Sequence, residues 1–369
     1  MTDRERFLAW MLGQPADRPP FWLYWGGWER TWQRWKCEGI PDQFTSFGDV
    51  REHFGSDRIP AVVGVNCGPC PRREITVIEE DDDYYTWTDG WGIKRRNPKA
   101  NESMSQFLEF PVKDRRGWLE YRDRWLDPDH PERLSGDWRD NAARWTAEGV
   151  PIQLGYYPDV ATFGALRWLL GDEECLLAFY TDPDLLREIL DHLTSLYLTV
   201  FEKVAAEVRV DLIHVWEDMC GRQGPLISPS HWAEFLGPCY RRIKAFADAH
   251  DIRLISVDTD GQPELIISPM MAAGVSYLYP MEVAAGCDVN DVRERYPELA
   301  MMGGIDKRAL AVGPDAIDAE LARVRPAMEK GRYIPDLDHC IPDDVSWPNY
   351  CYYAEALRKM VGKAAPGGA

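Results

Sequence analysis

The sequence predicts an α/β protein built as a (β/α)8, or TIM, barrel. From residue 151 to 365, short apolar runs alternate with segments of helical periodicity. Such alternation is typical of a parallel sheet with right-handed crossover helices. The chain carries no Gly-x-Gly-x-x-Gly loop, which favours a barrel over a dinucleotide-binding sheet. With 369 residues, 45% of them hydrophobic, the chain is long enough for one large barrel.

The N-terminal part, residues 1–150, is less regular, and we expect it to extend the same single domain. An amphipathic pattern predicts a helix over 2–14, capped by Thr2 or the residue after it. Prolines mark a turn at 15–20. The apolar run 21–25 then predicts the first strand.

An insertion follows the first strand. Residues 72–97 predict a β-hairpin, because the apolar run 75–78 leads into the acidic turn 79–83 and an aromatic strand then reaches the turn Asp89-Gly90. Residues 98–150 are polar and rich in proline and charge. We expect this stretch to cover the barrel mouth or an edge, as a lid would.

The regular part, 151–365, is assigned from periodicity and turn residues. Ser228-Pro229 marks one helix start, since proline is favoured at the first helical position. We expect strands at 151–156, 210–216, 252–257, 275–279, 299–303 and 332–335, and helices at 161–170, 172–180, 183–206, 229–249, 262–273, 289–295, 314–330 and 347–361.

Charge restricts the possible partners. The chain has 42 basic and 61 acidic side chains, a net charge of -19. This balance argues against nucleic acid and against an anionic membrane surface. We also expect no membrane-spanning helix, because no run of about 18 apolar residues occurs. The nine cysteines form no framework and predict a reduced, cytoplasmic protein. We interpret Cys67-Gly68-Pro69-Cys70 as an ordinary loop.

Two carboxylates at one predicted strand end mark the expected site. Asp258 and Asp260 stand one residue apart, after the apolar run 252–257. Buried carboxylates are costly unless they are paired, solvated or bound to a cation. The carboxyl ends of parallel strands are also where such folds bind ligands. A second acidic cluster, residues 336–338, precedes His339 at the end of another strand-like run.

Tryptophan is frequent, at 16 residues, and it gathers near the first strand. Trp25, Trp28, Trp32 and Trp35 have the spacing of one helical face. One interpretation is a packed core face. The alternative is an aromatic wall over a pocket for a flat or methylated ligand, with Trp25 and Trp28 as candidates for substrate contact.

Several different short motifs are spread along the chain from the N-terminus to the last predicted strand. They are Arg4-Glu5-Arg6, Asp17-Arg18-Pro19-Pro20, Glu217-Asp218, residues 224–229, Ala273-Gly274-Val275, residues 279–282, residues 303–307 and Asp338-His339. Together they resemble the uroporphyrinogen decarboxylase superfamily. That superfamily contains decarboxylases of the haem pathway and zinc-dependent methyltransferases that use corrinoid proteins or thiols. The resemblance implies a (β/α)8 barrel, in agreement with the periodicity.

The chain departs from both branches at their substrate-binding motifs. Decarboxylases carry an arginine-rich segment for the porphyrinogen carboxylates, whereas the equivalent residues 25–30 here are mostly aromatic and glycine. With a net charge of -19, an octacarboxylate would be a poor ligand. The methyltransferases carry His-x-Cys-Gly and a later cysteine. At those positions the resemblance places Asp258, Asp260 and His339.

This replacement implies two carboxylates and one histidine instead of thiolates. Such a set suits Mg, Mn, Fe(II) or a catalytic Zn. Asp258, Asp260 and His339 are therefore candidate ligands of a divalent metal and candidate catalytic residues. Glu217, Asp218 and Glu282, at other strand ends, are candidates for further ligands or for general acid–base roles.

Structural roles stay open for the same residues. Asp260 would then cap the following helix, and Asp258 would pair with Arg222 or Lys307. Lys307 would either anchor a substrate carboxylate or phosphate, or neutralise the acidic mouth. The substrate-binding candidates as a group are Trp25, Trp28, Tyr156, Tyr157, Arg222, Glu282 and Lys307.

We expect an enzyme that moves a methyl group from a small, aromatic or methylated substrate to a corrinoid on a partner protein or to another acceptor. One alternative is a decarboxylase or other lyase that acts on a small carboxylic acid or a tetrapyrrole-like substrate. The other is a non-enzymatic ligand-binding barrel. Because barrels of this superfamily often dimerise, we also expect a homodimer. We expect neither nucleic acid nor membrane as a partner.

Overall fold

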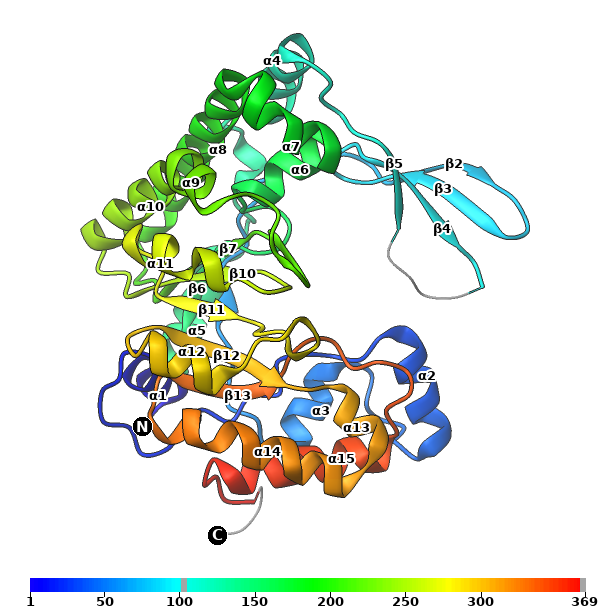
Figure 1. Ribbon diagram of the computed structural model, residues 1–369, viewed down its shortest axis with the longest axis vertical. Coiled ribbons are helices and arrows are strands. Elements are labelled where there is room, and N and C mark those ends of the chain that lie inside the picture. The colour runs from blue at the N-terminus through cyan, green and yellow to red at the C-terminus, as the bar shows by residue number, and fades with distance from the viewer. Residues whose placement is uncertain (101–104, 366–369) are drawn as a thin grey trace.

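The computed structural model describes residues 1–100 and 105–365. Four residues of the predicted cover, 101–104, lie outside that part. A curled parallel sheet forms the centre (Figure 1), with strand order β1-β6-β7-β10-β11-β12-β13. The strands are β1 (Ala61–Val62), β6 (Ile152–Leu154), β7 (Leu212–Trp216), β10 (Leu254–Asp258), β11 (Tyr277–Tyr279), β12 (Ala300–Ile305) and β13 (Tyr333–Leu337). The predicted alternation of strands and helices is confirmed, and each strand predicted after residue 150 overlaps an observed one.

Helices pack on the outer face of this sheet (Figure 1). The predicted helix 229–249 is three consecutive segments, because a π-helical turn at Trp232–Leu236 separates α9 from α10. No helix of residues 1–100 and 105–365 is long and apolar enough to cross a membrane. The helices are α6 (Phe163–Leu170), α7 (Asp172–Thr181), α8 (Pro183–Ala205), α9 (Pro229–His231), α10 (Gly237–Ala249), α11 (Glu264–Ala272), α12 (Val289–Arg295), α13 (Arg308–Val312), α14 (Pro314–Glu329) and α15 (Trp347–Met360).

The N-terminal helix α1 (Asp3–Met11) closes the amino end of the sheet interior. Thr2 caps it in a capping box with Glu5. Arg4 binds the carboxylate of Asp211, directly before β7, at 2.8–2.9 Å. The apolar interior at this end consists of Phe7, Met11, Trp22, Leu212, Leu254, Tyr277, Tyr279, Ala300, Met302 and Ile334.

The predicted first strand, 21–25, does not pair with a neighbouring strand. The parallel sheet ends at β1 on one side and at β13 on the other, so its backbone ladder has seven strands and not the eight of a closed barrel. A parallel backbone bridge forms beyond this segment, between Gly27 and Ile341. The closed eight-stranded ladder of the prediction is therefore not observed.

Side chains bind the backbone of segment 21–25 in place of a ladder. Asp336 on β13 accepts the N–H of Tyr24 at 2.6 Å, and Asp57 accepts the N–H of Phe21 at 2.8 Å. Arg51 donates to the carbonyl oxygens of Tyr24 and of the residue before it. Buried backbone groups must find partners, and here charged side chains supply them. The segment thus keeps an extended course without strand pairing.

The predicted hairpin at 72–97 exists, but it belongs to a larger antiparallel sheet. Its strands are β2 (Thr76–Glu80), β3 (Tyr84–Thr88), β4 (Lys94–Pro98) and β5 (Gln106–Glu109), in that spatial order. This inserted sheet projects from the body of the molecule (Figure 1), and all five residues of β2 are exposed. Helices α4 (Arg115–Trp125) and α5 (Trp138–Ala147) follow it.

The prediction that four tryptophans share one helical face is wrong for Trp25 and Trp28, which precede the helix. Helix α2 (Glu29–Glu38) begins after Trp28, so Trp25 lies outside the helix. Trp28 is 40% exposed, whereas Trp35 is fully buried and Trp32 packs against the core. The next helix, α3 (Phe47–Phe54), carries Arg51.

Asp57 allows a test of how segment 21–25 is attached. Burial alone would raise the pKa of this carboxyl, but hydrogen bonds from Arg18, Lys363 and the Phe21 amide hold the pKa below its usual range. The ionised carboxylate therefore stabilises the fold above the unfolded-state pKa of about 3.9, and this contribution is lost as the pH falls through the lower folded-state pKa. We expect Asp57→Asn to lower the free energy of unfolding by about 3 kcal/mol at neutral pH.

Denaturant unfolding at neutral pH and again at about pH 3 measures this contribution. The difference between wild type and Asp57→Asn should shrink at the lower pH. The exposed Asp42 provides a control, and Asp42→Asn should change the free energy by less than about 0.5 kcal/mol. An equal loss at both pH values would contradict the role of ionised Asp57.

Candidate functional site

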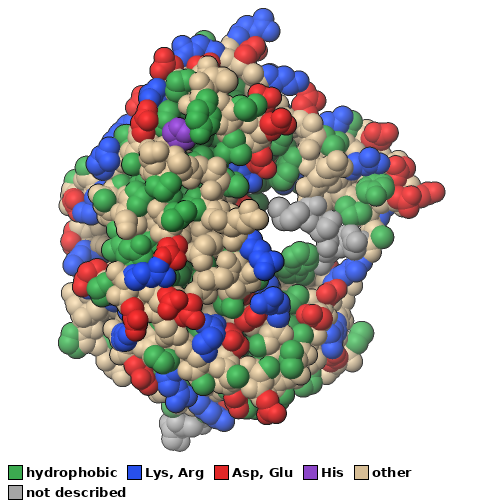
Figure 2. Space-filling view, viewed as in Figure 1, with side chains coloured by type: hydrophobic (Ala, Val, Ile, Leu, Met, Phe, Trp, Pro, Cys, Tyr) green, Lys and Arg blue, Asp and Glu red, His purple; other side chains and the backbone are tan. Residues whose placement is uncertain are grey.

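A cavity of about 630 Å³ lies at the carboxyl ends of the strands. Side chains from the ends of β7, β10 and β11 line it, together with the loop after β13. Four residues of the inserted sheet and its flanks, Ile93, Arg95, Phe107 and Phe110, form another part of the wall. The surface is hollowed beside the inserted sheet (Figure 2). The volume suits a small molecule.

Asp258 and Asp260 both face this cavity because the chain alternates direction at the end of β10. The residue between them, Thr259, is buried and accepts the N–H of Met219 at 3.0 Å. Gly261 follows with a φ of 79°, and a Cβ there would lie 2.5 Å from the backbone of Cys220. Only glycine fits that approach, so the turn holds both carboxyl groups in place.

The carboxyl groups of the cavity are difficult to ionise. Burial, with Asp260 and Asp218 nearby, raises the pKa of Asp258 well above its usual range. Burial, Asp218 and Glu282 raise the pKa of Asp260 to about 7. Burial also raises the pKa of Asp218, whose backbone adopts the left-handed region with a φ of 46°. Such conformations are uncommon outside glycine and cluster at functional sites.

His339 lies beside these acids. Its ring stacks on Trp25 with centroids 4.9 Å apart, and its Nε2 atom lies 3.7 Å from Asp260. Burial and the charge of Lys307 lower the pKa of His339 to about 4. The imidazole is therefore neutral at pH 7, and its contact with Asp260 is not an ion pair between two charged groups.

The predicted metal ligands do not assemble. Within residues 1–100 and 105–365, no three His, Cys, Asp or Glu side chains are placed to hold one metal ion. Asp258, Asp260 and His339 line the same cavity but do not converge on one point. The donor set thus does not fit the divalent metal that the resemblance implied. Among the same described residues, no ion pair joins Asp258 to Arg222 or Lys307, the alternative partners predicted for it.

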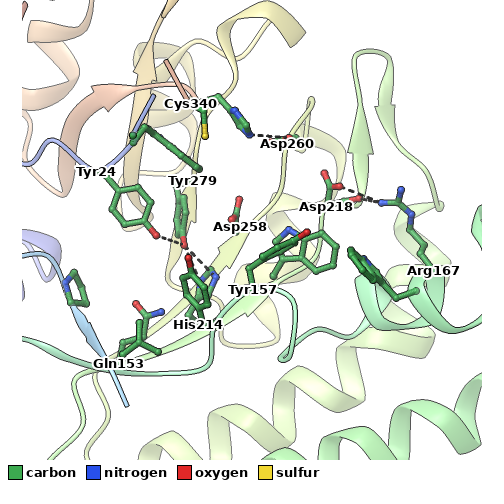
Figure 3. Close-up of a pocket in the computed structure, with 18 of the residues that line it drawn as sticks. Tyr24, Gln153, Tyr157, Arg167, His214, Asp218, Asp258, Asp260, Tyr279 and Cys340 are labelled. Carbon is green, nitrogen blue, oxygen red and sulfur yellow. Dashed lines mark hydrogen bonds and ion pairs between the residues drawn. The ribbon is translucent and has the colours of Figure 1, made fainter. Parts of the chain in front are cut away.

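A buried polar chain runs along the cavity floor (Figure 3). The hydroxyl of Tyr24 lies 3.4 Å from that of Tyr279, which lies 3.1 Å from Nδ1 of His214. The same nitrogen is 3.0 Å from the hydroxyl of Ser256. Burial lowers the pKa of His214 to about 3, so the ring is neutral.

Sequence reasoning missed this chain, although a signal was present. Counting back by two along β10 from Asp258 leads to Ser256, because alternate residues of a strand share one face. The same period on β7 places His214 on the face of Trp216, which lines the cavity. Both residues were assigned only to strand interiors.

Three arginines line the cavity, and each is bound to the protein. Arg51 donates to backbone carbonyls of segment 21–25. Arg95 pairs with Asp89 and lies over the ring of Trp168 at 4.2 Å. Arg167 binds Asp172 at 2.6 Å and the backbone oxygen of Asp218. None of the three was predicted from the sequence.

The other predicted site residues divide into two groups. Trp25, Tyr156, Tyr157 and Asp218 line the cavity. Glu217 is fully buried and turned away, because it accepts the backbone N–H groups of Thr162 and Gly164 at the start of α6. Glu217 is therefore not among the residues that line the cavity, and its predicted catalytic role stays a prediction. Trp28, Arg222, Glu282 and Lys307 are not among the residues that line the cavity.

Glu282 and Lys307 instead support the loops around the site. Glu282 accepts the N–H of Gly261 at 2.8 Å, which fixes the turn after Asp260. The backbone N–H of Lys307 donates to Asp338 at 3.1 Å. The charge of Lys307 lowers the pKa of Asp260, in agreement with the predicted alternative that this lysine neutralises the acidic mouth.

Comparison with solved structures shows the fold. A methyltransferase from Methanosarcina mazei aligns over 97% of this chain and 98% of its own, with 17% identity and a TM-score of 0.59. A putative vitamin-B12 independent methionine synthase from Listeria monocytogenes aligns over 60% of this chain and 59% of its own, with 12% identity and a TM-score of 0.27. The A. niger ochratoxinase covers 48% of this chain and 44% of its own, at 13% identity and a TM-score of 0.24.

Sequence comparison gives the family. A search of curated protein sequences found no match. A sequence profile described as uroporphyrinogen decarboxylase (URO-D) matches residues 169–360, just over half of the 369 residues. The matched region runs from the end of α6 to the end of α15 and contains the acids at the end of β10, His339 and the polar chain apart from Tyr24. The chain therefore belongs to the uroporphyrinogen decarboxylase family.

Proposed function

We propose that this protein is a methyltransferase that takes a methyl group from a small substrate in the cavity and passes it to an acceptor entering from the mouth. The observation that carries the proposal is the position of Asp258. Its carboxyl group lies in the middle of the cavity between aromatic side chains (Figure 3) and forms no ion pair within the part of the chain that the structure describes. The methyltransferase from Methanosarcina mazei, which shares this fold along the whole chain, supports the reaction class.

The cavity binds the substrate through its aromatic walls. Trp25, Trp216 and Trp168 all line it, and such rings bury much apolar area with few rotatable bonds. A volume of about 630 Å³ accommodates one small molecule. A corrinoid supplies a strong nucleophile for a methyl group, and it would have to approach from the mouth, carried by a partner protein.

Asp258 acts on the atom that loses the methyl group. When methyl leaves oxygen or sulfur, both electrons of the bond stay on that atom, which then needs a proton. Burial and the neighbouring Asp260 and Asp218 raise the pKa of Asp258, which favours the protonated form that can donate this proton. Asp260, with a pKa of about 7, titrates near neutral pH beside it. The hydroxyl groups of Tyr24 and Tyr279 orient the substrate by hydrogen bonds.

Decarboxylation of a small carboxylic acid is the second candidate, favoured by the three arginines that line the cavity. A substrate carboxylate would have to displace their present partners. Those partners include Asp89, Asp172 and backbone carbonyl groups. The arginine side chains that an acid substrate would need are thus already bound to other groups of the protein. Methyl transfer is therefore the better supported reaction.

Asp258→Asn tests the proposed acid. For an O-methyl or S-methyl donor, we expect kcat to fall about 10²–10³-fold, because the amide donates a hydrogen bond but no proton. KM should change little, since the side chains are nearly isosteric. Asp42→Asn, at an exposed position outside the cavity, should leave both constants unchanged. Wild-type turnover by Asp258→Asn would rule out this role.

Product analysis distinguishes the two reactions. The protein would be incubated with methoxyarenes, methylated amines or methyl thioethers, with a reduced corrinoid or a thiol as acceptor, and separately with small carboxylic acids including pyrrole acids. We expect demethylated product and methylated acceptor in equal amounts, and no carbon dioxide. Carbon dioxide from an acid substrate, without methyl transfer from any donor, would overturn the proposal in favour of decarboxylation.

A further inference from the structure

Two groups of aromatic side chains surround Asp258. Tyr24, Trp25 and Tyr279 form the first, with ring centroids 5.2–6.5 Å apart. Tyr157, Trp168 and Trp216 form the second, with centroids 4.8–6.1 Å apart. We call these six side chains the aromatic cage. Figure 3 shows Asp258 between Tyr24 and Tyr279 on one side and Tyr157 on the other.

The charges that face this cage are unbalanced. Asp218, Asp258 and Asp260 all line the cavity. The arginines of the lining already bind other protein groups, as described above. Arg167 lies 3.6 Å from Asp218. Among residues 1–100 and 105–365, neither Asp258 nor Asp260 forms an ion pair with a lysine or an arginine, and the neighbour of Asp260 at 3.7 Å is His339. An anionic ligand would therefore meet desolvated acids and arginines that already have partners. A positive ligand would favour the ionised form of these acids and be attracted by it.

The ring faces of the cage add to this preference, apart from Trp168, whose ring already lies 4.2 Å from the guanidinium of Arg95. The faces of tryptophan and tyrosine are negative, and they attract cations within about 6 Å of the ring centroid. A cage of such rings around a carboxyl group is the arrangement that recognises methylated ammonium groups, which are large, weakly hydrated and unable to fill a metal-ligand geometry. A compact metal ion fits poorly, because no three suitable donors of the described residues converge.

We propose that the aromatic cage, with Asp258 at its centre, binds a methylated ammonium group. That this group is also the methyl donor rests on the methyl transfer proposed above. In that step the C–N bond breaks and both electrons stay on nitrogen, which leaves as a neutral amine and needs no proton. The methyl carbon bonds to the lone pair of the acceptor, a thiolate or a reduced corrinoid. A bound cation lowers the pKa of Asp258 and favours its ionised form, so the carboxylate acts through its charge, and the cage releases the uncharged product.

Binding of matched ligands to the whole protein tests the proposal. Tetramethylammonium, choline and phenyltrimethylammonium would be titrated by calorimetry, with 3,3-dimethylbutan-1-ol as the uncharged isostere of choline. We expect choline to bind about tenfold more tightly than the isostere. Equal binding of choline and the isostere, or no binding of any of the three cations up to about 10 mM, would overturn the proposal.

Substitutions test whether the preference for choline over its isostere depends on the aromatic cage or on an unrelated change in the fold. Trp25→Leu and Asp258→Asn should each reduce the preference for choline to about twofold. Trp32 lies on α2 outside the lining, so Trp32→Leu should keep the full preference. Circular dichroism checks that each variant is folded, and Trp216→Leu replaces Trp25→Leu if the latter is not. A preference that survives both Asp258→Asn and the cage substitution would contradict the assignment.

The two proposals can fail separately. Binding of the cations without methyl transfer from any donor would support the aromatic cage as a binding site and contradict the proposed reaction. Methyl transfer from a methoxyarene, by a protein that prefers the uncharged isostere, would support the proposed reaction and contradict the binding of a methylated ammonium group by the cage.

Discussion

The hydrogen bond from the Tyr24 amide to the buried carboxyl group of Asp336 joins the first extended segment to the last strand of the sheet. Burial raises the pKa of Asp336 to about 7, although the Tyr24 and Leu337 amides and the Tyr353 hydroxyl all bind it. A carboxyl group in such a place is costly unless it is fully hydrogen-bonded. Here it is, and the same bond places Tyr24 and Trp25 at the cavity.

Strand periodicity organises the interior above this junction. Along β7 and β10, the inward residues change from leucine at the amino end, through His214 and Ser256, to Trp216 and Asp258 at the carboxyl end. The residues at the amino end pack against α1, whereas those at the carboxyl end line the cavity. This gradient explains how one sheet carries both an apolar core and a cluster of acids, because the acids face the cavity and not the core.

Much of the regular fold could be predicted from the sequence, because apolar runs and helical periods depend on neighbouring residues. The acids of β10, Trp25, Tyr156 and Tyr157 could be placed near the site for the same reason. What could not be predicted depends on distant contacts. The run 21–25 reads as a strand, but its partners Asp57 and Asp336 lie far along the chain. The burial of Glu217 under Thr162 and the cavity wall formed by Arg95 likewise require the folded chain.

The attachment of segment 21–25 has an evolutionary consequence. A backbone ladder is indifferent to most side-chain substitutions, since its bonds join main-chain atoms. A segment bound by Arg51, Asp57 and Asp336 can be shifted or loosened by one change at any of these positions. Because this segment carries part of the cavity wall, single substitutions at these positions can change the shape of the cavity while the seven-stranded ladder stays intact. Related chains can thus acquire new substrates without rebuilding the sheet.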